Sequence, residues 1–156
     1  MGTLLVCGGD QRSARRAPVD ANSLERSYPQ RGGGTVAEIT LISIVDDDKL
    51  VRKSIETLIK SCGFRVQAFA SAEDFLRYGN HRDTACLILE ARLPGMSGLE
   101  LQRQLAASHS RVPIIFVSAH DVQEAREKAL RAGAVAFLGK PFSDEALLTA
   151  VRSALE

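Results

Sequence analysis

The sequence predicts an α/β fold in which helices cover both faces of a parallel β-sheet. From Thr40 onward, five short apolar runs alternate with five segments of helical periodicity. A short, nearly continuous apolar run is typical of a strand buried on both faces, and a helix between successive strands allows them to lie parallel. The five strands are expected at residues 40–45, 64–69, 85–89, 112–118 and 134–138.

The first half of this pattern begins with TLISIV at residues 40–45. In the helix expected at 49–62, apolar residues recur every three or four positions, so one face can pack on the sheet. Residues 64–69 alternate apolar and polar side chains, which favours a strand near the edge of the sheet. Ser71 and Asp74 can cap the second helix. The apolar face of the first helix comprises Val51, Ile55, Leu58, Ile59 and Cys62.

In the second half, ACLIL, VPIIFVS and AVAFL are the three remaining strands. Ser97 and Glu100 have the spacing of a capping box for the third helix. An alanine-rich fourth helix is expected from about Asp121 to Arg131. Ser143 can cap the last helix, and acidic residues follow it. The apolar face of that helix comprises Leu147, Leu148, Val151 and Leu155.

Composition indicates a disordered tail at residues 1–37, followed by one folded domain at 38–156. The tail is basic and glycine-rich, with the flexible stretch RGGG at 31–34 and no apolar period. Its one aromatic residue, Tyr28, and the formal net charge of +1 for the whole chain disfavour direct nucleic-acid binding. No apolar run has the length needed to cross a bilayer, so no membrane association is expected.

Chemically active side chains follow four of the five strands. Asp46, Asp47 and Asp48 come after the first strand, Glu90 after the third, Ser118 ends the fourth, and Lys140 follows the fifth. The carboxyl ends of parallel strands meet at one edge of a sheet, where ligands bind. Clustered carboxylates favour a hard cation such as Mg²⁺, and a hydroxyl and an ammonium can bind phosphoryl oxygens.

Each of these residues also has a plain structural interpretation. Asp48 can be a helix N-cap, Ser118 a strand-end hydroxyl, and Lys140 a solvated loop lysine. The combination carries the argument, because four strand ends each supply a group that one phosphoryl site requires.

Four segments resemble the receiver domain of bacterial two-component response regulators. They are IVDDDKLVRKS, LILEARLPGMSGLEL, VPIIFVSAHD and AGAVAFLGKPF, and the resemblance covers residues 40–156. It implies a flavodoxin-like (βα)5 three-layer sandwich with a five-stranded sheet in the order 2-1-3-4-5.

The resemblance also implies roles for individual residues. Asp46 and Asp47 match the acidic pair that binds Mg²⁺, with Asp47 the direct ligand, and the backbone carbonyl of Arg92 matches a third protein ligand. Ser118 matches the switch hydroxyl and Phe137 the switch aromatic. Lys140 matches the lysine of the site, with a cis peptide bond expected before Pro141.

Glu90 departs from the family, because receivers carry the phosphoacceptor aspartate at this position. One extra methylene moves the carboxylate outward by about 1.5 Å, and a 1 Å error can cost on the order of 100-fold in rate. The longer side chain can instead meet Lys140 and the Ser118 hydroxyl and partly mimic a phosphoryl group. Two further explanations stay open: that Glu90 silences the switch, and that it is a deliberate substitution for aspartate.

The leading interpretation is a cytoplasmic, stand-alone receiver that is not an enzyme and signals through protein contacts. The chain ends at Glu156, directly after the last helix, so no output domain is expected. The expected partners are a sensor histidine kinase, a phosphotransfer protein or another receiver. The resemblance points to the face of the last two strands and helices, around Phe137, for partner binding and a possible homodimer.

Two alternatives remain. One is a Mg²⁺-dependent phosphatase of the haloacid-dehalogenase type with Asp46 as nucleophile, but Leu50 stands where that family prefers threonine or valine. The other is a silent scaffold or decoy receiver.

Overall fold

The computed structural model describes residues 39–119 and 123–156, which contain a parallel five-stranded sheet in the order β2-β1-β3-β4-β5. The predicted fold class and strand order are therefore confirmed. The expected tail at residues 1–37 lies outside the described residues, as does the expected start of the fourth helix at Asp121. The elements are β1 (Leu41–Val45), α1 (Lys49–Ser61), β2 (Arg65–Phe69), α2 (Ala72–Tyr78), β3 (Thr84–Glu90), α3 (Gly98–Ala107), β4 (Ile114–Ser118), α4 (Gln123–Arg131), β5 (Ala136–Gly139) and α5 (Asp144–Leu155).

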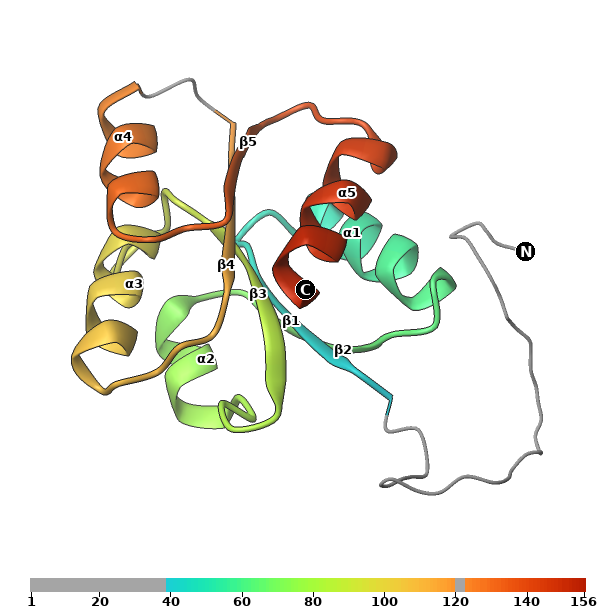
Figure 1. Cartoon of the computed structure of the whole chain (residues 1–156), viewed down its shortest axis with the longest axis horizontal. Coiled ribbons are helices and arrows are strands. Elements are labelled where there is room, and N and C mark those ends of the chain that lie inside the picture. The colour runs from blue at the N-terminus through green and yellow to red at the C-terminus, as the bar shows by residue number, and fades with distance from the viewer. Residues whose placement is uncertain (1–38, 120–122) are drawn as a thin grey trace. The chain divides into compact units, whose positions relative to one another are not determined.

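One compact unit, Leu41–Ile59 with Arg65–Glu156, contains the whole sheet and the candidate site. Within it, α2, α3 and α4 cover one face of the sheet, while α1 and α5 cover the other (Figure 1). A second unit groups residues 1–40 with Lys60–Phe64. Of that unit the structure describes residues 39–40 and 60–64, which include the end of α1 and a turn at Gly63 with φ of 93°.

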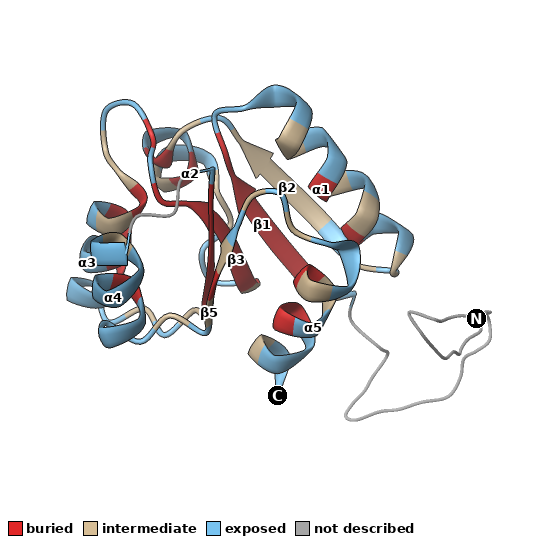
Figure 2. Cartoon of the chain, turned by 90° about the horizontal axis from the view of Figure 1, so that it is seen from above, coloured by how far each residue is buried: buried red, intermediate tan, exposed pale blue. Residues whose placement is uncertain are grey.

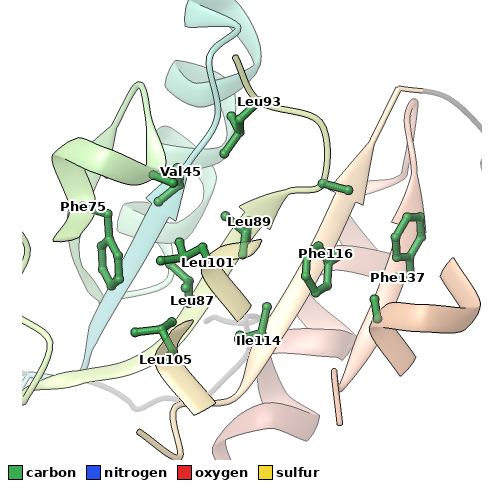
Figure 3. Close-up of a cluster of buried hydrophobic side chains, with 13 residues drawn as sticks. Val45, Phe75, Leu87, Leu89, Leu93, Leu101, Leu105, Ile114, Phe116 and Phe137 are labelled. Carbon is green, nitrogen blue, oxygen red and sulfur yellow. The ribbon is translucent and has the colours of Figure 1, made fainter. Parts of the chain in front are cut away.

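Burial follows the position of each strand in the sheet. The interior strands β1 and β4 are buried along their whole length, whereas β2, at one edge, has no fully buried residue. Figure 2 shows this difference between β1, in red, and β2, mostly in tan. This agrees with the alternating pattern of residues 64–69. A cluster of apolar side chains fills the space between the sheet and α2, α3 and α4, and it includes Phe75, Leu87, Leu101 and Phe116 (Figure 3).

The helices α1, α2, α3 and α5 start where the sequence predicts a cap. The hydroxyls of Ser71 and Ser143 accept hydrogen bonds from backbone amides three residues on. Ser97 and Glu100 form the full capping box. Asp48 caps α1 by accepting from the amides of Leu50 and Val51 at 3.0 and 3.2 Å. None of the helices in the described part of the chain is long and apolar enough to cross a membrane.

The expected strand boundaries agree with the structure to within one residue, except that β4 and β5 each begin two residues later than expected, and one residue of an expected packing face is exposed. β4 begins at Ile114, because Pro113 has no N–H for the ladder, although its carbonyl accepts from Leu87. β5 begins at Ala136, because Ala134 still closes the end of α4 through a bond to the Ala129 carbonyl. Leu155, expected on the buried face of α5, is 37% exposed.

Candidate functional site

Four strand ends bring their polar side chains to one edge of the sheet, as the sequence predicts. Asp46 directly follows β1 and Glu90 is the last residue of β3. Ser118 is the last residue of β4, and Lys140 directly follows β5. The side chains of Asp46, Glu90 and Ser118 lie inside the protein, with exposed fractions of 0%, 4% and 1% for these residues.

Lys140 joins the two buried carboxylates. Its Nζ lies 2.8 Å from Oδ2 of Asp46 and 2.7 Å from Oε1 of Glu90. Burial alone would lower the pKa of the Lys140 ammonium, but the hydrogen bonds and charges of Asp46 and Glu90 raise that pKa above its ordinary value. One cation therefore balances part of the charge of two buried acids.

Backbone amides hold the other oxygen of each carboxylate. The amide of Asp48 donates to Oδ1 of Asp46 over 2.9 Å, and the amide of Arg92 donates to Oε2 of Glu90 over 2.8 Å. Each oxygen of the two carboxylates thus has a donor, which fixes the orientation of both side chains.

The loops around the site are held by close backbone contacts. The Lys140 amide donates to the Ser118 carbonyl over 2.7 Å, and the Lys140–Pro141 peptide bond is cis, as expected. A Cβ atom at Gly98 would overlap the carbonyl oxygen of Glu90 and lie 3.0 Å from Cα of Ala91. Only glycine fits at the start of α3 without a shift of the chain that carries Glu90.

The contact between Glu90 and the Ser118 hydroxyl that the sequence left open is not formed. Ser118 Oγ is buried and has no hydrogen-bond partner. Glu90 directs Oε1 to Lys140 and Oε2 to the Arg92 amide instead. Of the two expected contacts of the glutamate, the one with Lys140 is therefore present and the one with Ser118 is not.

Phe137, the expected switch aromatic, points into the protein. The residue is 5% exposed, and its ring stacks on Phe116 with centroids 5.8 Å apart (Figure 3). Sequence reasoning missed Arg126 in α4, whose Nη1 donates to the Phe137 carbonyl over 2.8 Å. It also missed Arg52 in α1, whose Nη1 donates to the Asp46 carbonyl over 2.7 Å.

The residues expected to bind Mg²⁺ fit an ion only in part. Asp46, Glu90 and the Arg92 loop lie at one edge, whereas the Asp47 residue is exposed. Within residues 39–119 and 123–156, no group of three or more His, Cys, Asp or Glu side chains is placed to hold a metal ion. The oxygen donors that Mg²⁺ prefers are present, but Lys140 already pairs with two of them.

A groove of about 470 Å³ adjoins the site on the side of α1 and α5. Leu50, which is 81% exposed, lies at this groove together with Lys140. Its other lining residues include Val51, Leu58, Pro141, Phe142 and Leu147.

Comparison with known proteins gives a consistent family. A model of the response regulator receiver domain matches residues 42–152. The chain is 45% identical over 117 residues to response regulator protein TmoT of Ectopseudomonas mendocina, covering 75% of this chain and 53% of TmoT. It is 38% identical over 114 residues to transcriptional regulatory protein FixJ of Azorhizobium caulinodans, covering 73% of this chain and 54% of FixJ. The chain thus spans about half the length of these curated relatives.

Solved structures agree with this result. The crystal structure of FixJ-N superposes with a TM-score of 0.69 and 35% identity, covering 76% of this chain and 95% of that one. The BeF3-activated receiver domain of DrrB superposes with a TM-score of 0.68 and 30% identity, covering 76% of this chain and 98% of that one.

Proposed function

The chain belongs to the response regulator receiver domain family, and we propose that it is a receiver in which Glu90 occupies the position of the phosphoacceptor aspartate. Domains of this family act in two-component signalling, where they interact with sensor histidine kinases and phosphotransfer proteins. The strand order and the family do not favour the alternative of a phosphatase that uses Asp46 as a nucleophile.

The observation that carries this proposal is the 2.7 Å ion pair between Glu90 and Lys140. In a site built for phosphoryl transfer, an ammonium at this place neutralises negative charge on the phosphoryl oxygens. Here the glutamate carboxylate itself takes that contact. Glu90 carries the same single charge as an aspartate, but its extra methylene places that charge farther from the strand, toward the position that a phosphoryl group would occupy. A phosphoryl group would bring about −1.5 to −2 charges to the same place.

Phosphoryl transfer to Glu90 is unfavourable for two reasons. Its reactive oxygens lie about 1.5 Å farther from the strand than those of an aspartate, and an error of about 1 Å already costs on the order of 100-fold. In addition, the hydrogen bonds from Lys140 to Oε1 and from the Arg92 amide to Oε2 withdraw electron density from both oxygens, which makes each a weaker nucleophile. We therefore propose that phosphorylation of this receiver is lost.

Receiver domains generally bind Mg²⁺ at the acidic pocket. In this chain we propose weak binding by Asp46, Asp47, Glu90 and the backbone carbonyl of Arg92. A bound Mg²⁺ would supply charge neutralisation for phosphoryl oxygens. Asp46 and Glu90 both form ion pairs with Lys140, so the affinity for Mg²⁺ depends on the free energy needed to break these ion pairs.

The proposed output is a protein contact in the cytoplasm, without catalysis and without direct nucleic-acid binding by this domain. The groove beside Lys140 supports a helical partner of the kinase or phosphotransfer class, because its apolar lining suits the apolar face of a helix. Another receiver, or a second copy of this chain bound through α4, β5 and α5, would use the side around Phe137. A silent scaffold remains the alternative, and it would bind partners without any change of state.

Incubation with acetyl phosphate, read by intact mass, tests the loss of phosphorylation. The wild-type chain should stay at its unmodified mass, while Glu90→Asp should gain one phosphoryl group in the presence of Mg²⁺. The matched control, Glu90→Asp with Asp47→Asn, should lose that gain. Equal labelling of wild type and Glu90→Asp would refute the proposal.

A further inference from the structure

Arg126 in α4 contacts both the main chain and the ring of Phe137 in β5. Its Nη1 donates to the Phe137 carbonyl over 2.8 Å, and its Cζ lies 5.9 Å from the centroid of the ring. The second distance is within the range of a cation–π interaction. A single guanidinium thus fixes the backbone of this residue and attracts its side chain at the same time.

The position of β5 explains why such a contact is needed. β5 is the last strand of the sheet and pairs only with β4, where Phe137 lies opposite Phe116. Carbonyl groups on the open side of an edge strand have no strand to donate to them. The Phe137 carbonyl takes its donor from the Arg126 side chain instead.

The Glu90 side chain does not contribute a hydrogen bond to Phe137, because its hydrogen bonds go to Lys140 and to the Arg92 amide. Ser118, the expected switch hydroxyl at the end of β4, has no hydrogen-bond partner. Phe137 is nevertheless 5% exposed and stacked on Phe116. Its buried position is therefore explained by Arg126 and Phe116, without help from the glutamate.

We propose that Arg126 is a positioning residue that keeps the Phe137 ring buried. The ring then stays buried whichever side chain stands at position 90. The face formed by α4 and β5 would then present one constant surface to partners. This inference goes beyond the loss of phosphorylation, because it concerns the far side of β4 and can fail while that proposal holds.

Substitutions at position 126 separate the two contacts. Lysine keeps a positive charge but lacks the planar fork that can donate to a carbonyl while lying over a ring. Glutamine keeps a donor but has no charge for the ring, and alanine keeps neither. Ring burial should decrease from arginine to lysine and further to glutamine and alanine.

Fluorine NMR of the full chain labelled with 4-fluorophenylalanine measures that burial directly. The chain has six phenylalanines, and the Phe137 signal is identified by its absence in Phe137→Leu. A soluble gadolinium chelate should broaden this signal little in the wild type, several-fold more in Arg126→Gln and Arg126→Ala, and to an intermediate extent in Arg126→Lys.

Three controls decide the result. Arg131→Gln, on the same helix and also exposed, should leave the Phe137 signal unchanged, and so should Glu90→Gln. Unchanged protection in Arg126→Ala would overturn the proposal, as would exposure of the ring in Glu90→Gln. Broadening of Phe137 together with the fully buried Phe75 would mean a general loss of packing and would also overturn it.

Discussion

The Nζ atom of Lys140 lies 2.7 Å from Oε1 of Glu90, so an ion pair joins the end of β3 to the loop that follows β5. The same ammonium lies 2.8 Å from Oδ2 of Asp46, at the end of β1. The centre of the site is therefore two buried acids that share one lysine. Their charge balance determines how the domain should respond to substitution, pH and Mg²⁺.

Replacing Lys140 with methionine should destabilise the domain by about 3–5 kcal/mol, because it leaves two buried carboxylates without their cation. Urea denaturation at pH 7 measures the change in the free energy of unfolding. The matched control is Lys128→Met, which removes an exposed ion pair with Glu124 and should change that free energy by about 0.5 kcal/mol or less. Similar losses in the two variants would show that the Lys140 pairs are worth no more than a surface contact.

The stability that Lys140 provides should disappear in alkali. Its pKa is raised in the folded protein, so its contribution is fully present below the ordinary pKa of 10.5 and is lost as the pH rises through the folded value. Urea denaturation of wild type and Lys140→Met between pH 8 and pH 12 should show their difference shrinking only above about pH 10.5.

Cys86 adds a second alkaline loss that the same comparison removes. Burial raises the pKa of its thiol to about 12, so the unfolded chain ionises first and stability falls as the pH rises. Because Cys86 is present in both proteins, its effect cancels in their difference. A difference that is already shrinking at pH 8 would contradict the raised pKa of Lys140.

Mg²⁺ should raise the melting temperature of the wild type only slightly, because the ion competes with Lys140 for Asp46 and Glu90. Asp47→Ala should remove this response, and Lys140→Met should enlarge it, since both carboxylates then lack a cation. Thermal unfolding in a series of Mg²⁺ concentrations, with Ca²⁺-free buffer and Asp144→Ala as the surface control, provides the measurement. An undiminished response in Asp47→Ala would remove that residue from the proposed ligands.

Gly98→Ala should destabilise the domain by about 1–3 kcal/mol, because the added methyl group overlaps the backbone of Glu90. Gly139→Ala is the matched control, since its Cβ would meet no atom within 4 Å. Both changes reduce the freedom of the unfolded chain, so their difference isolates the overlap. Equal midpoints in urea would mean that the loop before α3 can shift freely.

Much of the site could be predicted from the sequence because it depends on topology. In a parallel sheet, residues at strand ends must converge, so Asp46, Glu90, Ser118 and Lys140 could be grouped without coordinates. Helix starts at Ser97 and Ser143 were equally predictable, because capping depends on neighbours only three residues away.

Other features depend on tertiary distances that the sequence does not contain. Whether Glu90 reaches Lys140 or Ser118 depends on shifts of about one bond length. In sequence, Arg126 looks like any polar residue on the solvated side of a helix, and its role arises only because α4 lies beside the open edge of β5. An expected edge strand that follows a helix with arginines on its solvated side is the signal that could have pointed to it.

We propose that Glu90, through Lys140, gives the pocket part of the charge of a phosphoryl group. A full change from a mostly inactive to a mostly active population takes about 5.5 kcal/mol, whereas one charge-assisted hydrogen bond gives about 1.5–3 kcal/mol. The most direct measurement compares amide NMR spectra of wild type, Glu90→Gln and phosphorylated Glu90→Asp. The wild-type signals of Ser118, Gly139 and Lys140 should fall between those of the other two proteins. Wild-type signals that coincide with those of Glu90→Gln would contradict this proposal, because the glutamate charge would then have no effect on these three residues around the pocket.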